Sequence, residues 1–140
     1  MRIFIGGVMQ ASTHGKGIMD QAYRNVLGDA LSARWPGVEV VDPYRLHPNS
    51  VEYGDPLVKE TLLELLTLAG GSDMMLAYLP VASMGTALEM YSAHQQGVPV
   101  VTISPMAENW VVRTFSRRVY SDVASFMAAV EAASSPADLI

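Results

Sequence analysis

The chain has 140 residues, of which half are hydrophobic and 16% are charged, and its formal net charge is −5. This length is enough for one domain with a sizeable core, and the high apolar fraction predicts further apolar surface buried between subunits. The acidic balance argues against non-specific binding to nucleic acid or to an anionic membrane, and the absence of cysteine excludes disulfides, thiolate zinc sites and cysteine nucleophiles.

Targeting and membrane signals are absent from the sequence. The first apolar run is too short for a signal peptide and reads directly as a strand. No run of about 20 apolar residues is present that would span a membrane. We therefore expect a soluble cytoplasmic protein.

Short apolar or β-branched runs alternate with helical patterns along the chain, which is typical of parallel βαβ units. Strands are expected at residues 2–5, 38–41, 74–79, 99–103 and 118–120. Helices are expected over about 18–34, 57–69, 85–96, 108–116 and 122–133. The pattern predicts a single α/β domain over residues 1–140, with a doubly wound five-stranded parallel sheet of flavodoxin-like or Rossmann-like type, order 2-1-3-4-5, and helices on both faces.

The first expected helix has apolar residues at helical spacing. They predict one buried face, which would contain Met19, Ala22, Tyr23, Val26 and Leu27.

The predicted topology restricts where chemistry can take place. In open parallel sheets, ligands bind outside the carboxyl ends of the strands. The segments that would form this rim are 6–17, 42–56, 80–86 and 104–110, and they contain most of the Gly, Ser, His and Asn residues suited to binding.

The most informative segment begins where the third expected strand ends. Ser83, Gly85 and Thr86 lead into a helix that has Glu89 in its first turns. Free backbone N–H groups at a helix start, together with two hydroxyls and a glycine, form a cradle suited to an anion. The glycine would also let a ligand approach the backbone closely.

An ordinary structural explanation of this segment is also available. Ser83 would then be a helix N-cap and Glu89 a charge near the positive end of the helix. The neighbours Leu88, Met90 and Ala93 are apolar, which places Glu89 among residues expected to be buried. A buried carboxylate requires compensation, and this favours a functional role.

Residues 73–105 resemble the signature of the nucleoside 2-deoxyribosyltransferases and of related enzymes that hydrolyse nucleoside 5′-monophosphates. The resemblance consists of an Asp, an apolar strand ending in Pro, Ser-X-Gly-X-X-X-Glu, a helix and Gly-X-Pro-Val-Val. It implies that Glu89 attacks the anomeric carbon of a sugar and forms a glycosyl-enzyme intermediate. A carboxylate suits this chemistry because the transition state resembles an oxocarbenium ion.

Within that family, the residue matching Ser83 separates two branches. The resemblance implies that transferases acting on unphosphorylated nucleosides have an acidic residue there, whereas the monophosphate hydrolases have Ser. A carboxylate would repel a phosphate, but a hydroxyl beside helix N–H groups would bind it. The expected substrate is therefore a nucleotide, with an unphosphorylated nucleoside as the alternative.

The resemblance also implies a second acid, which handles the base during proton transfer. Glu64 fits that position if one residue is inserted in segment 69–72, and Glu60 lies one turn earlier on the same face. Asp42 and Asp55 are weaker candidates. Alternatively, the two glutamates are simply the solvated edge of an amphipathic helix.

Two further parts of the chain are expected to contribute to substrate binding. Gly6 and Gly7 would admit the base or sugar, although a tight turn explains them equally well. Asn109 resembles a residue that family members insert into a neighbouring subunit's site, which implies a homodimer or homotetramer with shared sites; its alternative role is a helix cap. Arg113 is a candidate for assisting a phosphate, as are Arg117 and Arg118.

No metal or cofactor is expected, because the three histidines do not form a metal-ligand spacing. Two other functions remain open. Phosphoribohydrolases share a Gly-Thr-X-X-Glu loop, but that loop begins with Pro-Gly-Gly, which segment 80–83 lacks. A non-catalytic nucleotide-binding module would keep the cradle without turning over a substrate.

Overall fold

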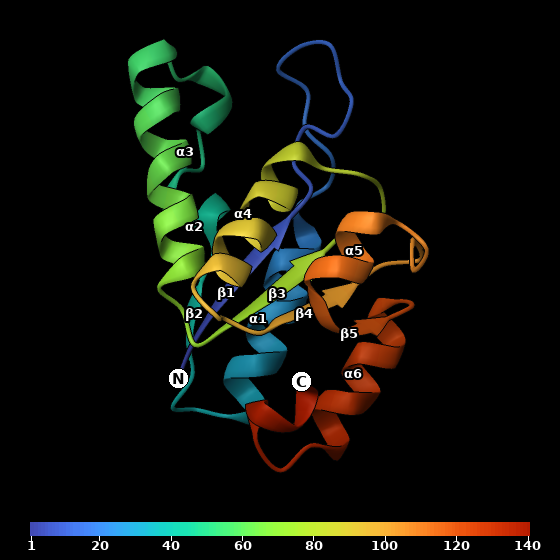
Figure 1. Ribbon diagram of the computed structural model, residues 1–140. Helices are drawn as coiled ribbons and strands as arrows, with labels where there is room; N and C mark the ends of the chain where they lie inside the picture. The colour runs from blue at the N-terminus through green and yellow to red at the C-terminus, as the bar shows by residue number, and fades with distance from the viewer.

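Five parallel strands form one sheet in the order β2-β1-β3-β4-β5, as predicted (Figure 1). The computed structural model describes residues 1–140. The strands are β1 (Arg2–Gly7), β2 (Glu39–Val41), β3 (Met74–Tyr78), β4 (Val100–Ile103) and β5 (Ser116–Tyr120). The helices are α1 (Ala22–Arg34), α2 (Pro43–Leu46), α3 (Asp55–Gly70), α4 (Met84–Gln95), α5 (Trp110–Phe115) and α6 (Val123–Ala132), with short 3-10 turns η1 (Ser50–Glu52) and η2 (Pro136–Leu139).

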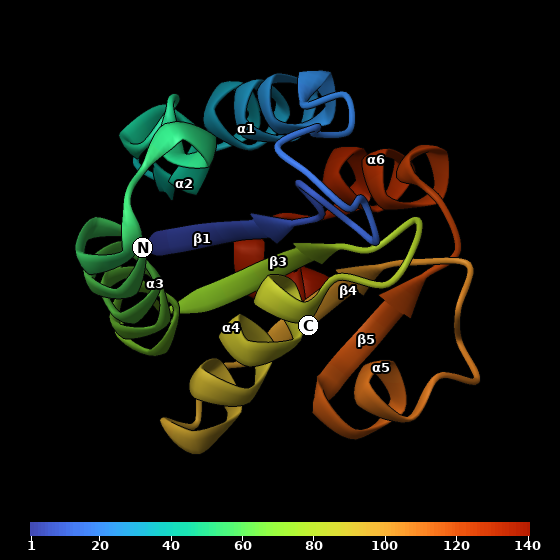
Figure 2. The same cartoon turned by 90° about the horizontal axis from the view of Figure 1, so that it is seen from above.

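Helices cover both faces of the sheet, which confirms the doubly wound architecture (Figure 2). Successive strand side chains point to opposite faces, so each strand contributes to two cores. Ile3 and Ile5 pack with α1 and α6 on one face. Phe4 of the same strand packs with α3 and α4 on the other face.

The first helix begins later than predicted, and it buries a different face. It starts at Ala22 rather than near residue 18, because the side chain of Asp20 accepts a hydrogen bond from Ala22 N (2.9 Å) and residues 8–20 form a loop. Val26 is half exposed, whereas Arg24 is 2% exposed. The buried face therefore contains a charged residue that the apolar spacing did not predict.

The segment expected to be a long loop between β2 and α3 contains two short helical turns, α2 and η1. Asp42 directly follows β2, and its Oδ1 accepts a hydrogen bond from Tyr44 N (3.0 Å), which caps α2. These turns, the β1–α1 loop and the start of α4 all lie at the carboxyl end of the sheet (Figure 1). None of the helices has both the length and the apolar character that crossing a membrane requires.

Candidate active site

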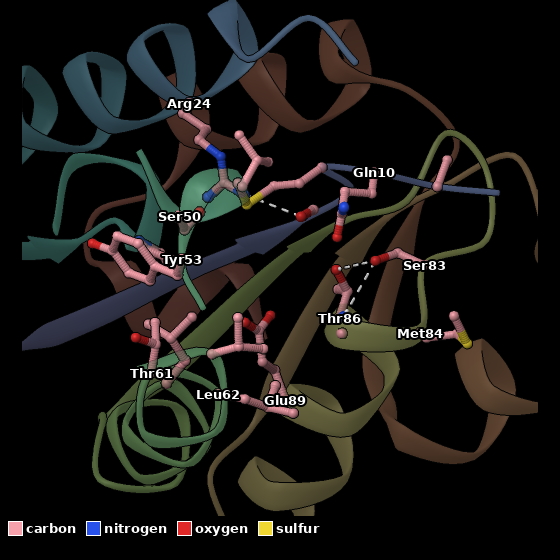
Figure 3. A pocket seen from close by; sticks show the side chains of 18 residues that line it. Gln10, Arg24, Ser50, Tyr53, Thr61, Leu62, Ser83, Met84, Thr86 and Glu89 are labelled. Carbon is pink, nitrogen blue, oxygen red and sulfur yellow. Dashed lines mark hydrogen bonds between the residues drawn. The ribbon is translucent and has the colours of Figure 1, made fainter. Parts of the chain in front are cut away.

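A cavity of about 370 Å³ opens at the carboxyl end of the strands, where the parallel topology predicts a ligand site. One wall is the start of α4, from Ser83 to Glu89. The opposite wall comes from α2, η1 and α3, and the β1–α1 loop and Arg24 complete the lining (Figure 3). A cavity of this volume is in the range that accommodates a small organic ligand.

Glu89 is the only carboxylate that lines this cavity, and its side chain is almost fully enclosed. The residue is 6% exposed. Burial raises the pKa of Glu89 to about 8, and the nearby positive charge of Arg24 opposes that rise. The prediction that Glu89 would be buried is confirmed, and perturbed carboxyl groups in cavities are common at catalytic sites.

The two glycines that end β1 make room for side chains on opposite faces of the sheet. A Cβ atom added to Gly6 would lie 2.6 Å from Oε2 of Glu89 and 2.5 Å from Cε of Met75. A Cβ atom added to Gly7 would collide with the hydroxyl of Tyr23. Gly6 is therefore needed for close approach of Glu89, and Gly7 lines the cavity itself.

The start of α4 has the predicted cap. Ser83 Oγ accepts hydrogen bonds from Thr86 N (3.3 Å) and Thr86 Oγ1 (3.0 Å), as Figure 3 shows. The first intrahelical bond is donated by Ala87 N to Ser83 O (3.1 Å), so the amides of Met84 and Gly85 precede it. Ser83, Gly85 and Thr86 all line the cavity, which leaves these amides close to a site for an anion.

The structure does not bring the candidate second carboxylates into the cavity lining. Glu64 is exposed, does not line the cavity, and lies 3.2 Å from Nε2 of His47, whose Nδ1 lies 3.2 Å from the hydroxyl of the cavity residue Tyr53. Glu60 and Asp55 are also exposed and do not line the cavity. Asp42 is buried, but it pairs with Arg24 (3.0 Å). A proton-transfer role for Glu64 stays a prediction.

Asn109 takes the structural role that the sequence left open. Its Oδ1 accepts hydrogen bonds from Val111 N (2.9 Å) and Val112 N (3.4 Å), which caps α5. The residue does not line the cavity of its own chain. Arg113, the candidate phosphate ligand, pairs with Glu108 (3.3 Å) at the surface.

The wall formed by α2, η1 and α3 is mostly apolar, and sequence reasoning did not identify it. It is lined by Pro43, Val51, Val58, Leu62 and Leu65. Thr61 lies in the same wall, is 6% exposed, and its Oγ1 has no hydrogen-bond partner. A flat apolar ligand group would fit against this wall.

Arg24 was also missed by sequence reasoning, which treated α1 as an ordinary amphipathic helix. The available signal was its spacing, since Arg24 falls on the same helical face as Leu27, Gly28 and Leu31. A charged residue on an otherwise buried stripe must find buried partners. In the structure those partners are main-chain carbonyls and Asp42.

The protein therefore belongs to the class of doubly wound α/β proteins that have a ligand-sized cavity at the carboxyl ends of the strands. No protein-family model matches the chain, and no curated protein does. Solved structures do match it over nearly their whole length. The 2-deoxyribosyltransferase of the psychrotolerant bacterium Bacillus psychrosaccharolyticus has a TM-score of 0.73 and 18% identity, over 99% of this chain and 96% of that one.

Two further structures share the architecture. A conserved protein of Enterococcus faecalis V583 has a TM-score of 0.64 and 18% identity, over 94% of this chain and 98% of that one. The Clostridium botulinum CMP N-glycosidase BcmB has a TM-score of 0.55 and 15% identity, over 95% of this chain and 100% of that one. The resemblance to the nucleoside 2-deoxyribosyltransferases and their N-glycosidase relatives is thereby confirmed at the level of the fold.

Proposed function

We propose that this chain is an enzyme that cleaves the N-glycosidic bond of a nucleoside 5′-monophosphate, with Glu89 as the nucleophile. The observation that carries the proposal is the single carboxyl group enclosed in the cavity, one turn into α4. The similarity of the fold to a 2-deoxyribosyltransferase and a CMP N-glycosidase supports it.

The cavity has three zones that match the three parts of a nucleotide. The apolar wall of α2, η1 and α3 would hold the base, and the amides at the start of α4 would hold the 5′-phosphate. Glu89 lies between these zones, where C1′ of the sugar would be placed. Ser83, Gly85 and Thr86 are then phosphate-binding residues, Gly6 leaves space for Glu89, and Gly7 lines the cavity.

The proposed reaction has two steps. In the first, an oxygen of ionised Glu89 forms a bond to C1′ while the C1′–N bond breaks, and the bonding electrons leave with the base. The base takes up a proton. Because no second carboxylate lines the cavity, this proton would come from water or from Glu64. In the second step, water attacks C1′ and gives up a proton to solvent while the bond from C1′ to the Glu89 oxygen breaks, which releases the sugar phosphate and regenerates the carboxylate; an acceptor base in place of water gives transfer.

Substrate-panel assays test the proposal. Purified protein is incubated with nucleoside 5′-monophosphates and with the matching nucleosides, and free base is measured by chromatography. We expect base release from at least one monophosphate, faster than from its nucleoside, and none above background from the E89Q variant. Calorimetric binding of monophosphates without any base release would instead identify a non-catalytic binding module. Adding a second base separates hydrolysis from transfer.

We further propose that the active assembly is a homodimer or larger homo-oligomer. Met84 (83% exposed), Trp110 (85% exposed) and the half-exposed Leu88 and Tyr91 place large apolar side chains on α4 and α5. Surface of this kind supports a subunit interface. Mixing E89Q with N109A chains would restore activity if Asn109 completes the neighbouring site. No recovery in a mixed dimer would assign Asn109 to capping α5 alone.

A further inference from the structure

Arg24 takes the place of a missing strand at the end of β1. The pairing of β1 with β2 extends from Arg2 to Phe4, because β2 ends at Val41. Beyond that point Arg24 donates hydrogen bonds from Nη1 to Ile5 O (3.0 Å) and from Nη2 to Gly7 O (3.0 Å). These carbonyls would otherwise be buried without partners, which is costly.

The guanidinium is itself held rigidly. Nε donates to Gln21 Oε1 (2.7 Å), and Nη1 donates to Asp42 Oδ1 (3.0 Å). Both side chains of the ion pair are nearly fully buried, at 2% and 3% exposed. A buried ion pair contributes little to net stability compared with apolar residues, so its presence beside a cavity points to another role.

The end of β1 that Arg24 braces is the surface on which Glu89 rests. Oε2 of Glu89 lies 2.6 Å from where a Cβ of Gly6 would be, and Gly6 stands between the two carbonyls that Arg24 binds. Arg24 approaches from α1 and Glu89 from α4, on opposite sides of β1 (Figure 3). Arg24 also lines the cavity.

We propose that Arg24, held by Asp42, is a positioning residue for Glu89: it fixes the strand end that supports the carboxyl group and supplies the buried positive charge that favours its ionised form. The inference builds on the proposed role of Glu89 as nucleophile. The other titratable side chains nearby are the phenol of Tyr23, whose pKa burial raises, and that of Tyr53, which lines the cavity. Burial has the larger effect on the pKa of Glu89, and Arg24, which Asp42 holds in place, is the charge that opposes it.

The test measures the pKa of Glu89 directly, in protein without substrate. Glutamate labelled with carbon-13 at the carboxyl carbon is titrated by NMR, and the E89Q variant assigns the signal. Arg24→Met removes the positive charge and should raise the pKa of Glu89 by about one unit or more. Asp42→Asn removes the opposing negative charge and should lower it.

Arg34 provides the matched control on the same helix. It also donates to main-chain carbonyls, those of Val130 (3.3 Å) and Ala133 (2.6 Å), but it does not line the cavity. Arg34→Met should therefore lower stability without changing the pKa of Glu89. If Arg24→Met does not fold, the change in the pKa of Glu89 in Asp42→Asn still tests the proposal.

Opposite shifts in the Arg24 and Asp42 variants, with none in the Arg34 variant, support the proposal. An unchanged pKa in Asp42→Asn, or shifts of the same sign in both, would overturn it. Because the titration needs no turnover, a chain that shows these shifts but releases no base contradicts the proposed function and leaves this inference intact. For a chain that turns over its substrate, the ascending, acid-side limb of kcat/KM against pH should move with the same signs.

Discussion

Glu89 and Glu64 are carboxylates on adjacent helices, and the sequence suggests a catalytic role for each, yet their surroundings are opposite. Glu89 is 6% exposed at the start of α4, against Gly6 and within the cavity. Glu64 has a side chain that is 53% exposed, and it contacts His47 on the outside of α3. Burial raises the pKa of the first to about 8. The difference teaches that the position of a carboxylate relative to the cavity, rather than its residue type, decides whether it can contact a ligand there.

The largest expected effect comes from Glu89→Gln. This change keeps the shape of the side chain but removes the nucleophilic oxygen, so we expect kcat to fall by at least about 10³-fold. The measurement is base release from the best monophosphate, with circular dichroism showing that the fold is kept. Turnover near the wild-type level would show that Glu89 is not the nucleophile.

Gly6→Ala tests the close contact on which Glu89 depends. The new methyl group would meet Oε2 of Glu89 at 2.6 Å, which forces the carboxylate or the strand to move. We expect about 100-fold lower kcat and a free energy of unfolding lower by about 1–3 kcal/mol. Gly15→Ala is the control, because an added Cβ there meets nothing within 4 Å. If Gly6→Ala and Gly15→Ala have the same kcat and the same free energy of unfolding, Glu89 does not depend on the absence of a side chain at Gly6.

The raised pKa of Glu89 predicts a pH dependence of both activity and stability. Only the ionised carboxylate attacks, so kcat/KM should rise about tenfold per pH unit below about 8 and then level off. Between pH 4.5 and 8 the folded chain holds a proton at Glu89 that the unfolded chain has released. The free energy of unfolding should therefore fall as pH rises through this window, by about 1.4 kcal/mol per unit of pKa shift.

The control for the stability measurement is again Glu89→Gln, which has no proton to lose. Urea denaturation at several pH values should show a weaker decline for this variant than for the wild type. Parallel curves for the two proteins would mean that the pKa of Glu89 is not raised.

Ser83→Ala tests the phosphate end of the cavity. It removes the hydroxyl that caps α4, which should cost about 1 kcal/mol of stability. It should raise KM for a monophosphate about five- to tenfold. The matching nucleoside, assayed in parallel, should be little affected, and an equal rise for both substrates would place the phosphate elsewhere.

The smallest expected effect is that of Glu64→Gln. Because Glu64 lies outside the cavity lining, we expect less than about a twofold change in kcat and a stability change within about 0.5 kcal/mol. Base-release assays on this variant complete the comparison with Glu89→Gln. A loss of 10²-fold or more would restore Glu64 as the proton-transfer residue and imply movement of α3 on binding.

The strands and the rim at their carboxyl ends could be predicted because they depend on local patterns, whereas the strand order 2-1-3-4-5 came from precedent for doubly wound sheets. The apolar runs predict β1 and β3. Pro80, Ser83 and Gly85 mark where β3 ends and α4 begins, and therefore where the rim forms. The burial of Glu89 followed from its apolar neighbours Met90 and Ala93.

Other features depend on contacts between distant segments, which spacing along one helix does not reveal. Arg24 is buried because β2 ends at Val41 and leaves carbonyls of β1 without partners. Whether Glu64 lines the cavity could not be predicted, because the direction of its side chain depends on how α3 packs on its neighbours. Neither outcome is contained in the local pattern of α1 or α3.

The central claim is tested most directly by trapping the glycosyl-enzyme. A 2-fluoro sugar nucleotide slows release of the intermediate, because fluorine destabilises positive charge at C1′. Protein treated with this analogue is digested, and the peptides are analysed by mass spectrometry. We predict one added fluorosugar phosphate, attached to Glu89. Attachment to another residue would contradict the account, as would base release by the Glu89→Gln variant at the wild-type rate.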